Sequence, residues 1–248
     1  MSDLGGCEAV ICDIDGCLAP ESSGPMHAEA LARIARWNRA SIERGGPILT
    51  VCSGRPQPFA EAMCRLLGND RLPCIAENGV WLYDPKTNRY ERDPAITPEH
   101  LQAVHEVARW VEQELSPRGV VMQPGKSASV SLYHPDPEYL RSTIRPIVET
   151  AFRVCGWPLR VSMTWLYINC DLAHVSKGSG IDRLCAAAGL QRDRLVGIGD
   201  TLSDEAIADR VAWFACPANA DPRLKARAHF LASEPEAMGV LEILSRLT

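Results

Sequence analysis

Residues Asp13–Leu18 (DIDGCL) decide how this sequence is interpreted, and they follow directly on the apolar run Glu8–Cys12 (EAVIC). That short run includes β-branched residues and predicts a buried strand ending at Asp13. Side chains alternate along extended backbone, so Asp13 and Asp15 can point the same way. Gly16 allows a sharp turn. The segment predicts two carboxylates at the carboxyl end of a strand, where an open parallel sheet binds its ligands.

Two carboxylates this close destabilise each other unless a cation lies between them or one carries a proton. Either arrangement suits phosphate-ester chemistry, because one carboxylate can attack phosphorus while the other handles the proton of the leaving group. The alternative is an acidic turn after a strand. The motif alone is therefore only suggestive.

Strands and helices alternate on both sides of a central block. Strands are predicted at Pro47–Cys52, Cys74–Ala76, Trp81–Tyr83 (in a hairpin), Leu195–Ile198 and Val211–Ala215, and helices at residues 27–43, Pro58–Leu67, Gly178–Ala188 and Ser203–Asp209. Such alternation predicts an α/β fold with a parallel sheet and right-handed crossovers.

The central block, residues 85–170, predicts a compact αββαββ unit. It contains a helix that begins at Thr97-Pro98 and carries apolar residues to Leu115, strands at Val120–Gln123 and Ala128–Tyr133, a helix from Asp136 to Ala151, and strands at Arg160–Ser162 and Trp165–Asn169. We therefore expect a core domain from residues 1–84 and 171–248, with an α/β domain inserted at 85–170.

Three further motifs stand where a strand or loop enters a helix. Thr50–Pro56 (TVCSGRP) offers a hydroxyl and N–H groups that suit a phosphate, although Ser53 also fits an ordinary helix cap. In Val175–Gly178 (VSKG), Lys177 can neutralise phosphoryl oxygens, although a lone lysine is usually solvated.

The last of these motifs, Gly197–Asp204 (GIGDTLSD), places Asp200 at a strand end as an oxygen ligand for a hard cation, with Asp204 able to join it or orient its waters. Alternatively, Thr201 or Ser203 simply caps the next helix. Acids from several motifs would meet at one crevice. A carboxylate site without His or Cys favours Mg²⁺ over Zn²⁺.

Together, Asp13–Leu18, Ser53–Pro56, Val175–Gly178 and Gly199–Ala206 resemble the motifs of the haloacid dehalogenase-like (HAD) superfamily, and more narrowly the Cof-like phosphatases. Members of that group carry an α/β cap between the second and third motifs, which is where the inserted block falls. The resemblance implies a Rossmann-like parallel-sheet core with an inserted α/β cap, and it covers nearly the whole chain.

The resemblance also implies roles for individual residues. Asp13 would be the nucleophile and Asp15 the general acid/base; Ser53 and Lys177 would hold the phosphoryl group; Asp13, Asp15 (through its main-chain carbonyl) and Asp200 would bind Mg²⁺, with Asp204 beside them; Gly54, Arg55, Asn78 and Gly79 would lie on the substrate side. Cys17 and Ser203 depart from the usual Thr and Asn. The second departure leaves the part played by Asp204 open.

Substrate choice is assigned to the cap. Lys126, in the loop between two cap strands, can reach an anionic or hydroxyl-rich leaving group, although most lysines are simply exposed. Trp165 and Tyr167 are interpreted as core or sheet-face residues of a cap strand. Sugar phosphates, phosphoglycolate and phosphorylated glycerate derivatives all remain open as substrates.

Composition narrows the function further. The net charge of −5 argues against binding to nucleic acid or anionic membranes, and no apolar run approaches the ~20 residues that span a bilayer. Met1–Gly6 lacks the features of a signal peptide, so we expect a cytoplasmic protein. The ten cysteines contain no Cys-x-x-Cys pair and are interpreted as reduced core residues.

The sequence predicts a Mg²⁺-dependent phosphomonoesterase acting on a small phosphorylated metabolite, as a monomer or homodimer. Two alternatives remain. One is a phosphomutase or phosphotransferase of sugar phosphates, and the other is a non-catalytic sugar-phosphate-binding protein. The intact aspartates and lysine argue against the second alternative.

Overall fold

A parallel sheet with strand order β12-β11-β10-β1-β2 carries the predicted motifs in the computed structural model, which describes residues 6–247. Its strands are β1 (Ala9–Cys12), β2 (Ile48–Val51), β10 (Leu195–Ile198), β11 (Trp213–Cys216) and β12 (Phe230–Leu231). Strand β1 lies between β2 and β10 and is fully buried, which explains why its sequence is apolar without alternation. Residues 1–5 belong to the N-terminal segment that is predicted to lack the features of a signal peptide, and they lie outside the described residues.

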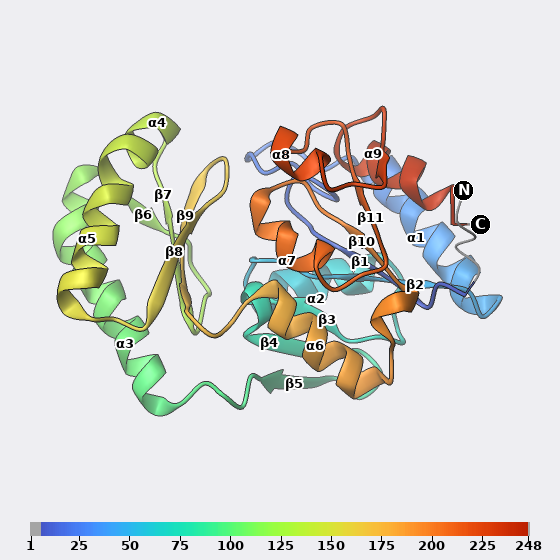
Figure 1. Cartoon of the computed structure of the whole chain (residues 1–248), viewed down its shortest axis with the longest axis horizontal. Coiled ribbons are helices and arrows are strands. Elements are labelled where there is room, and N and C mark those ends of the chain that lie inside the picture. The colour runs from blue at the N-terminus through green and yellow to red at the C-terminus, as the bar shows by residue number, and fades with distance from the viewer. Residues whose placement is uncertain (1–5, 248) are drawn as a thin grey trace.

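Helices cover both faces of this sheet (Figure 1). They are α1 (Ala28–Glu43), α2 (Gln57–Leu66), α6 (Lys177–Ala188), α7 (Glu205–Ala208), α8 (Pro222–Lys225) and α9 (Glu236–Leu244), with 3₁₀ turns at Arg192–Arg194 and Leu202–Asp204. Val10 packs in the cluster that includes residues of α1 and α9, whereas Ile11 packs in the cluster that includes residues of α6 and α7. Successive side chains of β1 thus anchor opposite layers.

A small antiparallel sheet, β3-β4-β5, lies beside the parallel one. It consists of β3 (Cys74–Ala76), β4 (Trp81–Asp84) and β5 (Arg89–Arg92), with a 3₁₀ turn at Glu77–Gly79 between the first two. The predicted hairpin is present. Strand β5 was not predicted because its residues, Arg-Tyr-Glu-Arg, are all exposed and show no apolar alternation.

The inserted cap contains an antiparallel sheet of order β6-β7-β9-β8. In chain order it comprises α3 (Pro98–Trp110), a π-helical turn (Val111–Leu115), a 3₁₀ turn (Ser116–Arg118), β6 (Val121–Met122), β7 (Ser129–Tyr133), α4 (Pro137–Tyr139), a second π-helical turn (Leu140–Ile144), α5 (Arg145–Cys155), β8 (Leu159–Met163) and β9 (Tyr167–Leu172). Helices α3 and α5 cover the outer face of this sheet, and the other face is turned toward the core (Figure 1). The predicted fold class is confirmed.

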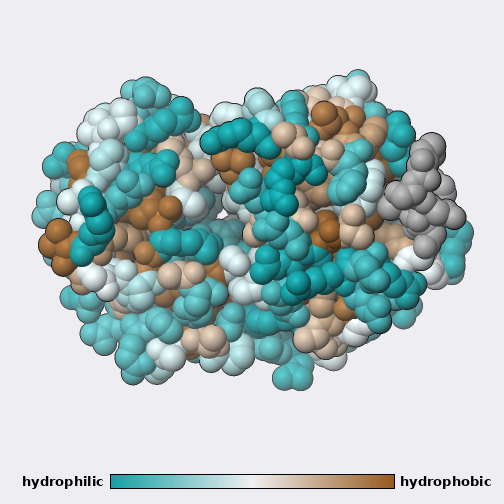
Figure 2. Space-filling model, viewed as in Figure 1, coloured by the Kyte–Doolittle hydropathy of each residue, from teal (hydrophilic) through white to brown (hydrophobic). Residues whose placement is uncertain are grey.

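In the space-filling view, the molecule is narrower between the core lobe and the cap lobe (Figure 2). Two strands bear on the domain limits: β5, which follows residue 85, pairs with core strand β4, and cap strand β9 extends past residue 170 to Leu172. The domain limits at residues 85 and 170 stay a prediction. One detail is corrected: Trp165 lies in the turn between β8 and β9 with 43% of its surface exposed, because the strand starts only at Tyr167.

The cysteines are free, and seven of the ten are buried. Cys155 is exposed, and Cys7 and Cys185 are partly buried. Burial raises the pKa of the Cys52 and Cys170 thiols, which keeps them protonated. In the described part of the chain, no helix combines the length and apolarity needed to cross a bilayer.

Candidate active site

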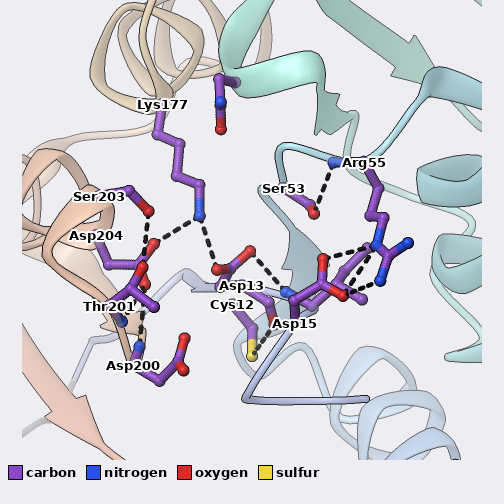
Figure 3. Close-up of polar contacts among 12 residues, drawn as sticks. Cys12, Asp13, Asp15, Ser53, Arg55, Lys177, Asp200, Thr201, Ser203 and Asp204 are labelled. Carbon is purple, nitrogen blue, oxygen red and sulfur yellow. Dashed lines mark hydrogen bonds and ion pairs between the residues drawn. The ribbon is translucent and has the colours of Figure 1, made fainter. Parts of the chain in front are cut away.

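Lys177 joins two of the predicted motifs to each other. It is the first residue of α6, and its Nζ lies 2.8 Å from Asp13 Oδ2 and 2.6 Å from Asp204 Oδ1 (Figure 3). All three side chains are buried. Burial alone would lower the pKa of Lys177, but the facing carboxylates of Asp13 and Asp204 raise it well above its ordinary value. The lysine is therefore a fixed positive charge beside Asp13.

Asp13, Asp200 and Asp204 form a buried acidic cluster in which one carboxylate oxygen from each lies within 4.8 Å of the others. Asp200 has no exposed surface, and among the described residues neither of its carboxylate oxygens has a hydrogen-bond partner. Burial, followed by the charge of Asp204, raises the pKa of both Asp13 and Asp200. Unpaired buried carboxylates are costly unless a cation balances them, and oxygen donors of this kind fit Mg²⁺.

Asp204 also supports the loop that carries Asp200. Its Oδ2 accepts hydrogen bonds from the N–H groups of Asp200 (3.0 Å) and Thr201 (3.1 Å), while its Oδ1 receives Lys177. These contacts fix the loop after β10. Gly16, with φ at +74°, lies close to the Asp200 carboxylate, and a methyl group there would lie 1.9 Å from Asp200 Oδ2.

Asp15 and Arg55 form a second charged pair near the cluster. The Arg55 Nε donates to both oxygens of Asp15, at 2.9 and 2.8 Å (Figure 3). The guanidinium also lies over the Phe59 ring, 5.0 Å from its centroid. Both charged side chains line the same cavity as Asp13. Arg55 thereby orients the carboxylate that the sequence assigns to acid–base chemistry.

The cavity lies between core and cap and has a volume of about 50 Å³. It is lined by the predicted residues Asp13, Asp15, Gly54, Arg55, Asn78, Lys126 and Lys177, and by Glu21, Gln123, Thr164, Tyr167, Asn169, Thr201 and Ser203, which were not predicted as site residues. The predicted Ser53, Gly79, Asp200 and Asp204 lie outside its lining. Its walls are mainly polar and carry charges of both signs.

Three of the predicted residues make contacts that hold the site together. Ser53 is buried, and its hydroxyl accepts the N–H of Arg55 at 3.1 Å rather than capping α2, whose N-cap is Pro56. Asn78 donates to both carboxylate oxygens of Asp171 in β9. A methyl group on Gly79 would lie 2.3 Å from the carbonyl oxygen of Ser176, so the glycine allows the start of α6 to pack closely.

Lys126 reaches the cavity from the cap. Its amine donates to the hydroxyl of Ser131, which is hydrogen-bonded to Asn169 Oδ1 at 2.5 Å. Burial lowers the pKa of Lys126, and the nearby acids Asp171 and Glu77 oppose that effect. The lysine is thus part of the cavity wall and not a freely solvated side chain.

One sequence pattern could have identified some of the cap-side cavity residues that were not predicted. In β9 the polar residues Tyr167, Asn169 and Asp171 alternate with Ile168, Cys170 and Leu172. Such a period of two marks one polar and one apolar sheet face. Tyr167 was interpreted as a core or sheet-face residue, and it lies with Asn169 on the polar face, which lines the cavity.

Comparisons with known proteins place this chain in a family. A family model described as haloacid dehalogenase-like hydrolase matches residues 10–116 and 141–244. A phosphoglycolate phosphatase of Methanospirillum hungatei is 23% identical over 239 residues, covering 95% of this chain and 94% of that protein.

Solved structures agree on the fold. A HAD/COF-like hydrolase from Plasmodium vivax aligns with a TM-score of 0.74 at 16% identity, covering 98% of this chain and 96% of that one. A sucrose-phosphatase from Synechocystis, solved with sucrose and phosphate, aligns with a TM-score of 0.71 at 16% identity, covering 97% of each chain. The chain belongs to the haloacid dehalogenase-like hydrolase family. The predicted resemblance is confirmed, and so is the prediction of an enzyme.

Proposed function

We propose that this protein is a Mg²⁺-dependent phosphatase that hydrolyses a small phosphate monoester through an aspartyl-phosphate on Asp13. One observation carries the proposal above the others: the Asp13 carboxylate meets a buried lysine at 2.8 Å and belongs to an acidic cluster in which Asp200 has no hydrogen-bond partner among the described residues. Asp13, Asp200 and the main-chain carbonyl of Asp15 would hold Mg²⁺, which would offset charge on the transferring phosphoryl group.

In the first step, a carboxylate oxygen of Asp13 attacks phosphorus. The bond from phosphorus to the ester oxygen breaks, and the departing alkoxide takes a proton from Asp15, which acts here in its protonated form. Lys177 keeps a positive charge next to the attacking carboxylate and the phosphoryl oxygens. The buried surroundings of Asp13 limit competing contacts with bulk water.

In the second step, Asp15 takes a proton from water, which attacks the phosphorus of the aspartyl-phosphate. The bond to Asp13 breaks, inorganic phosphate leaves, and the carboxylate is regenerated. Arg55 orients Asp15 in both steps through the contacts of its Nε to the two carboxylate oxygens. Asp204 acts indirectly by holding Lys177 and the Asp200 loop.

The leaving group faces the cap wall, which offers Lys126 together with amide and hydroxyl groups. A carboxylate on the leaving group would complement the lysine. The name of the Methanospirillum relative, phosphoglycolate phosphatase, supports a compact phospho-acid as substrate. We therefore place 2-phosphoglycolate first among the candidate substrates.

The proposal is tested by incubating the purified protein with Mg²⁺ and a panel of small phospho-acids and sugar phosphates. We expect release of inorganic phosphate, with 2-phosphoglycolate the best substrate, and loss of release on chelation. An isomerised sugar phosphate in place of free phosphate would instead indicate a phosphomutase. Acid quenching, borohydride reduction and mass spectrometry should find homoserine in place of Asp13. Turnover without that product would contradict the covalent intermediate.

A further inference from the structure

The turn at Glu77–Gly79 connects the two lobes through a buried carboxylate that does not line the cavity. Glu77 belongs to the core, is 1% exposed, and points its side chain at the cap loop 124–128. It accepts the N–H of Ser127 at 3.0 and 3.1 Å and the N–H of Ala128 at 3.1 Å. Its oxygens also accept the hydroxyls of Ser127 (3.1 Å) and, more weakly, Ser129 (3.5 Å).

Glu77 is itself fixed by the loop that follows β2. Its N–H donates to the carbonyl of Arg55 at 3.0 Å, and the N–H of Asn78 donates to the carbonyl of Ser53 at 3.0 Å. Glu77 and Asn78 have φ of +47° and +53°. Such a conformation is unfavourable for a non-glycine residue, and it persists only where surrounding contacts impose it. The direction of the Glu77 side chain is therefore determined by the core.

The cap loop makes further contacts with the core at the same place. Trp81 Nε1, in β4, donates to the hydroxyl of Ser127 at 2.8 Å. Gly125 has φ of +84°, and a methyl group on it would lie 3.5 Å from Pro56 Cβ. The loop is thus seated against the core on both sides of Lys126, the residue that lines the cavity.

We propose that Glu77 is a positioning residue for substrate recognition: by binding the backbone of Ser127 and Ala128, it holds Lys126 where its ammonium meets a carboxylate on the leaving group. The inference rests on the proposed function. It adds that substrates with an anionic leaving group depend on this contact between core and cap, and that substrates without one do not. Glu77 acts through Lys126 and touches no reacting atom.

Charge and hydrogen bonding both fit this role. The Glu77 carboxylate favours the protonated form of Lys126, opposing the effect of burial. Burial in turn raises the pKa of Glu77, more than the Ser127 and Ala128 N–H groups lower it. Gln at position 77 would carry no charge and would offer one acceptor oxygen where Glu77 offers two, so the N–H groups of Ser127 and Ala128 would be held less firmly.

The test compares wild type, E77Q, K126A and the double variant on 2-phosphoglycolate and on p-nitrophenyl phosphate, whose leaving group has no carboxylate. E77Q should raise KM for phosphoglycolate roughly tenfold with kcat and the aryl ester changed less than about twofold. In the K126A background, E77Q should have no further effect on KM. Equal effects on both substrates, or additive effects in the double variant, would overturn the inference.

A matched control and an activity-independent readout complete the test. Glu242 also accepts a backbone N–H and a hydroxyl, both from Ser233, but on helix α9, so E242Q should leave both substrates unaffected. Amide hydrogen exchange of residues 124–131 should be faster in E77Q than in wild type. If wild type hydrolyses no phosphate ester, the proposed function fails, and the exchange result still decides whether Glu77 holds the loop. Unchanged exchange would overturn that role.

Discussion

The core side and the cap side of the cavity are built in different ways. On the core side, Asp13 and Lys177 sit at a strand end and a helix start and are 5% and 4% exposed. On the cap side, Lys126, Tyr167 and Asn169 are only half-buried and project from a loop and one face of an antiparallel sheet. The groups proposed to react are thus fixed by buried backbone, whereas the groups proposed to face the leaving group belong to a surface whose residue types can change without disturbing the core.

The largest effect is expected on the core side. D13N should lower phosphate release at least about a thousandfold, because an amide is a poor nucleophile for phosphorus. Circular dichroism should show an unchanged fold. D209N, which alters an exposed aspartate paired with Arg227, serves as the control and should keep wild-type turnover. Full activity of D13N would remove Asp13 from the mechanism.

Asp200 tests whether the core side binds a cation. Saturating Mg²⁺ should raise the Tm of the wild type by about 5 °C and of D200N by much less. Without Mg²⁺, D200N should be at least as stable as wild type, since it removes a buried carboxyl group that has no hydrogen-bond partner among the described residues and that costs free energy to ionise. Calorimetry measures both, with D70N, at an exposed residue paired with Arg71, as control. An equal Mg²⁺ response in D200N would contradict the assignment.

Substitutions on the cap side should affect substrate selection more than the rate of the chemical step. K126A should reduce kcat/KM for 2-phosphoglycolate about tenfold more than for p-nitrophenyl phosphate, because it removes the cation facing the carboxylate. Steady-state kinetics on the two esters measures the ratio. K86A, in the turn between β4 and β5, is the matched control. A uniform loss on both esters would mean that Lys126 supports structure and does not recognise the leaving group.

The smallest effect, a change in Tm, is expected from a substitution of Glu21, which lies at the boundary between the core side and the cap side. Its Oε1 accepts the N–H of Leu166, its Oε2 is buried without a partner among the described residues, and burial raises its pKa above the ordinary 4.5. The folded state therefore holds this proton more tightly than the unfolded state does. The associated stability is complete below the ordinary pKa and is lost as pH rises.

Since Gln cannot ionise, E21Q should exceed the wild-type Tm by about 2 °C near neutral pH and by nothing near pH 4. Thermal melts at both pH values measure the difference, with the exposed E112Q as control. A constant difference across pH would show that ionisation of Glu21 is not its cause.

The same contrast explains what could be predicted from the sequence. Asp13, Lys177 and Asp200 follow strand and helix boundaries, and parallel strands bring their carboxyl ends to one edge. Their meeting was therefore predictable. The cavity wall formed by Gln123, Thr164 and Asn169 depends on how the cap sheet lies against the core, and no short motif encodes that arrangement. Helix α9 and the exposed strand β5 were also missed.

Glu77 illustrates a second reason why some contacts could not be predicted from the sequence. It was visible in the sequence beside Asn78 and Gly79, but its carboxylate does not line the cavity and its partners include backbone groups about fifty residues away. Pattern analysis assigns roles to residue types, whereas this contact depends on a left-handed turn and on a loop whose own sequence is unremarkable. Long-range contacts to backbone leave no periodic signal.

Gly16 is a position at which a substitution would disturb the acidic cluster without changing any ionisable group. A single methyl group there would occupy the space of the Asp200 carboxylate, so the turn after β1 and the acidic cluster cannot vary independently. An alanine at this position would displace a candidate metal ligand while leaving every charge in the sequence unchanged. The backbone after β1 is therefore itself a steric part of the candidate metal site.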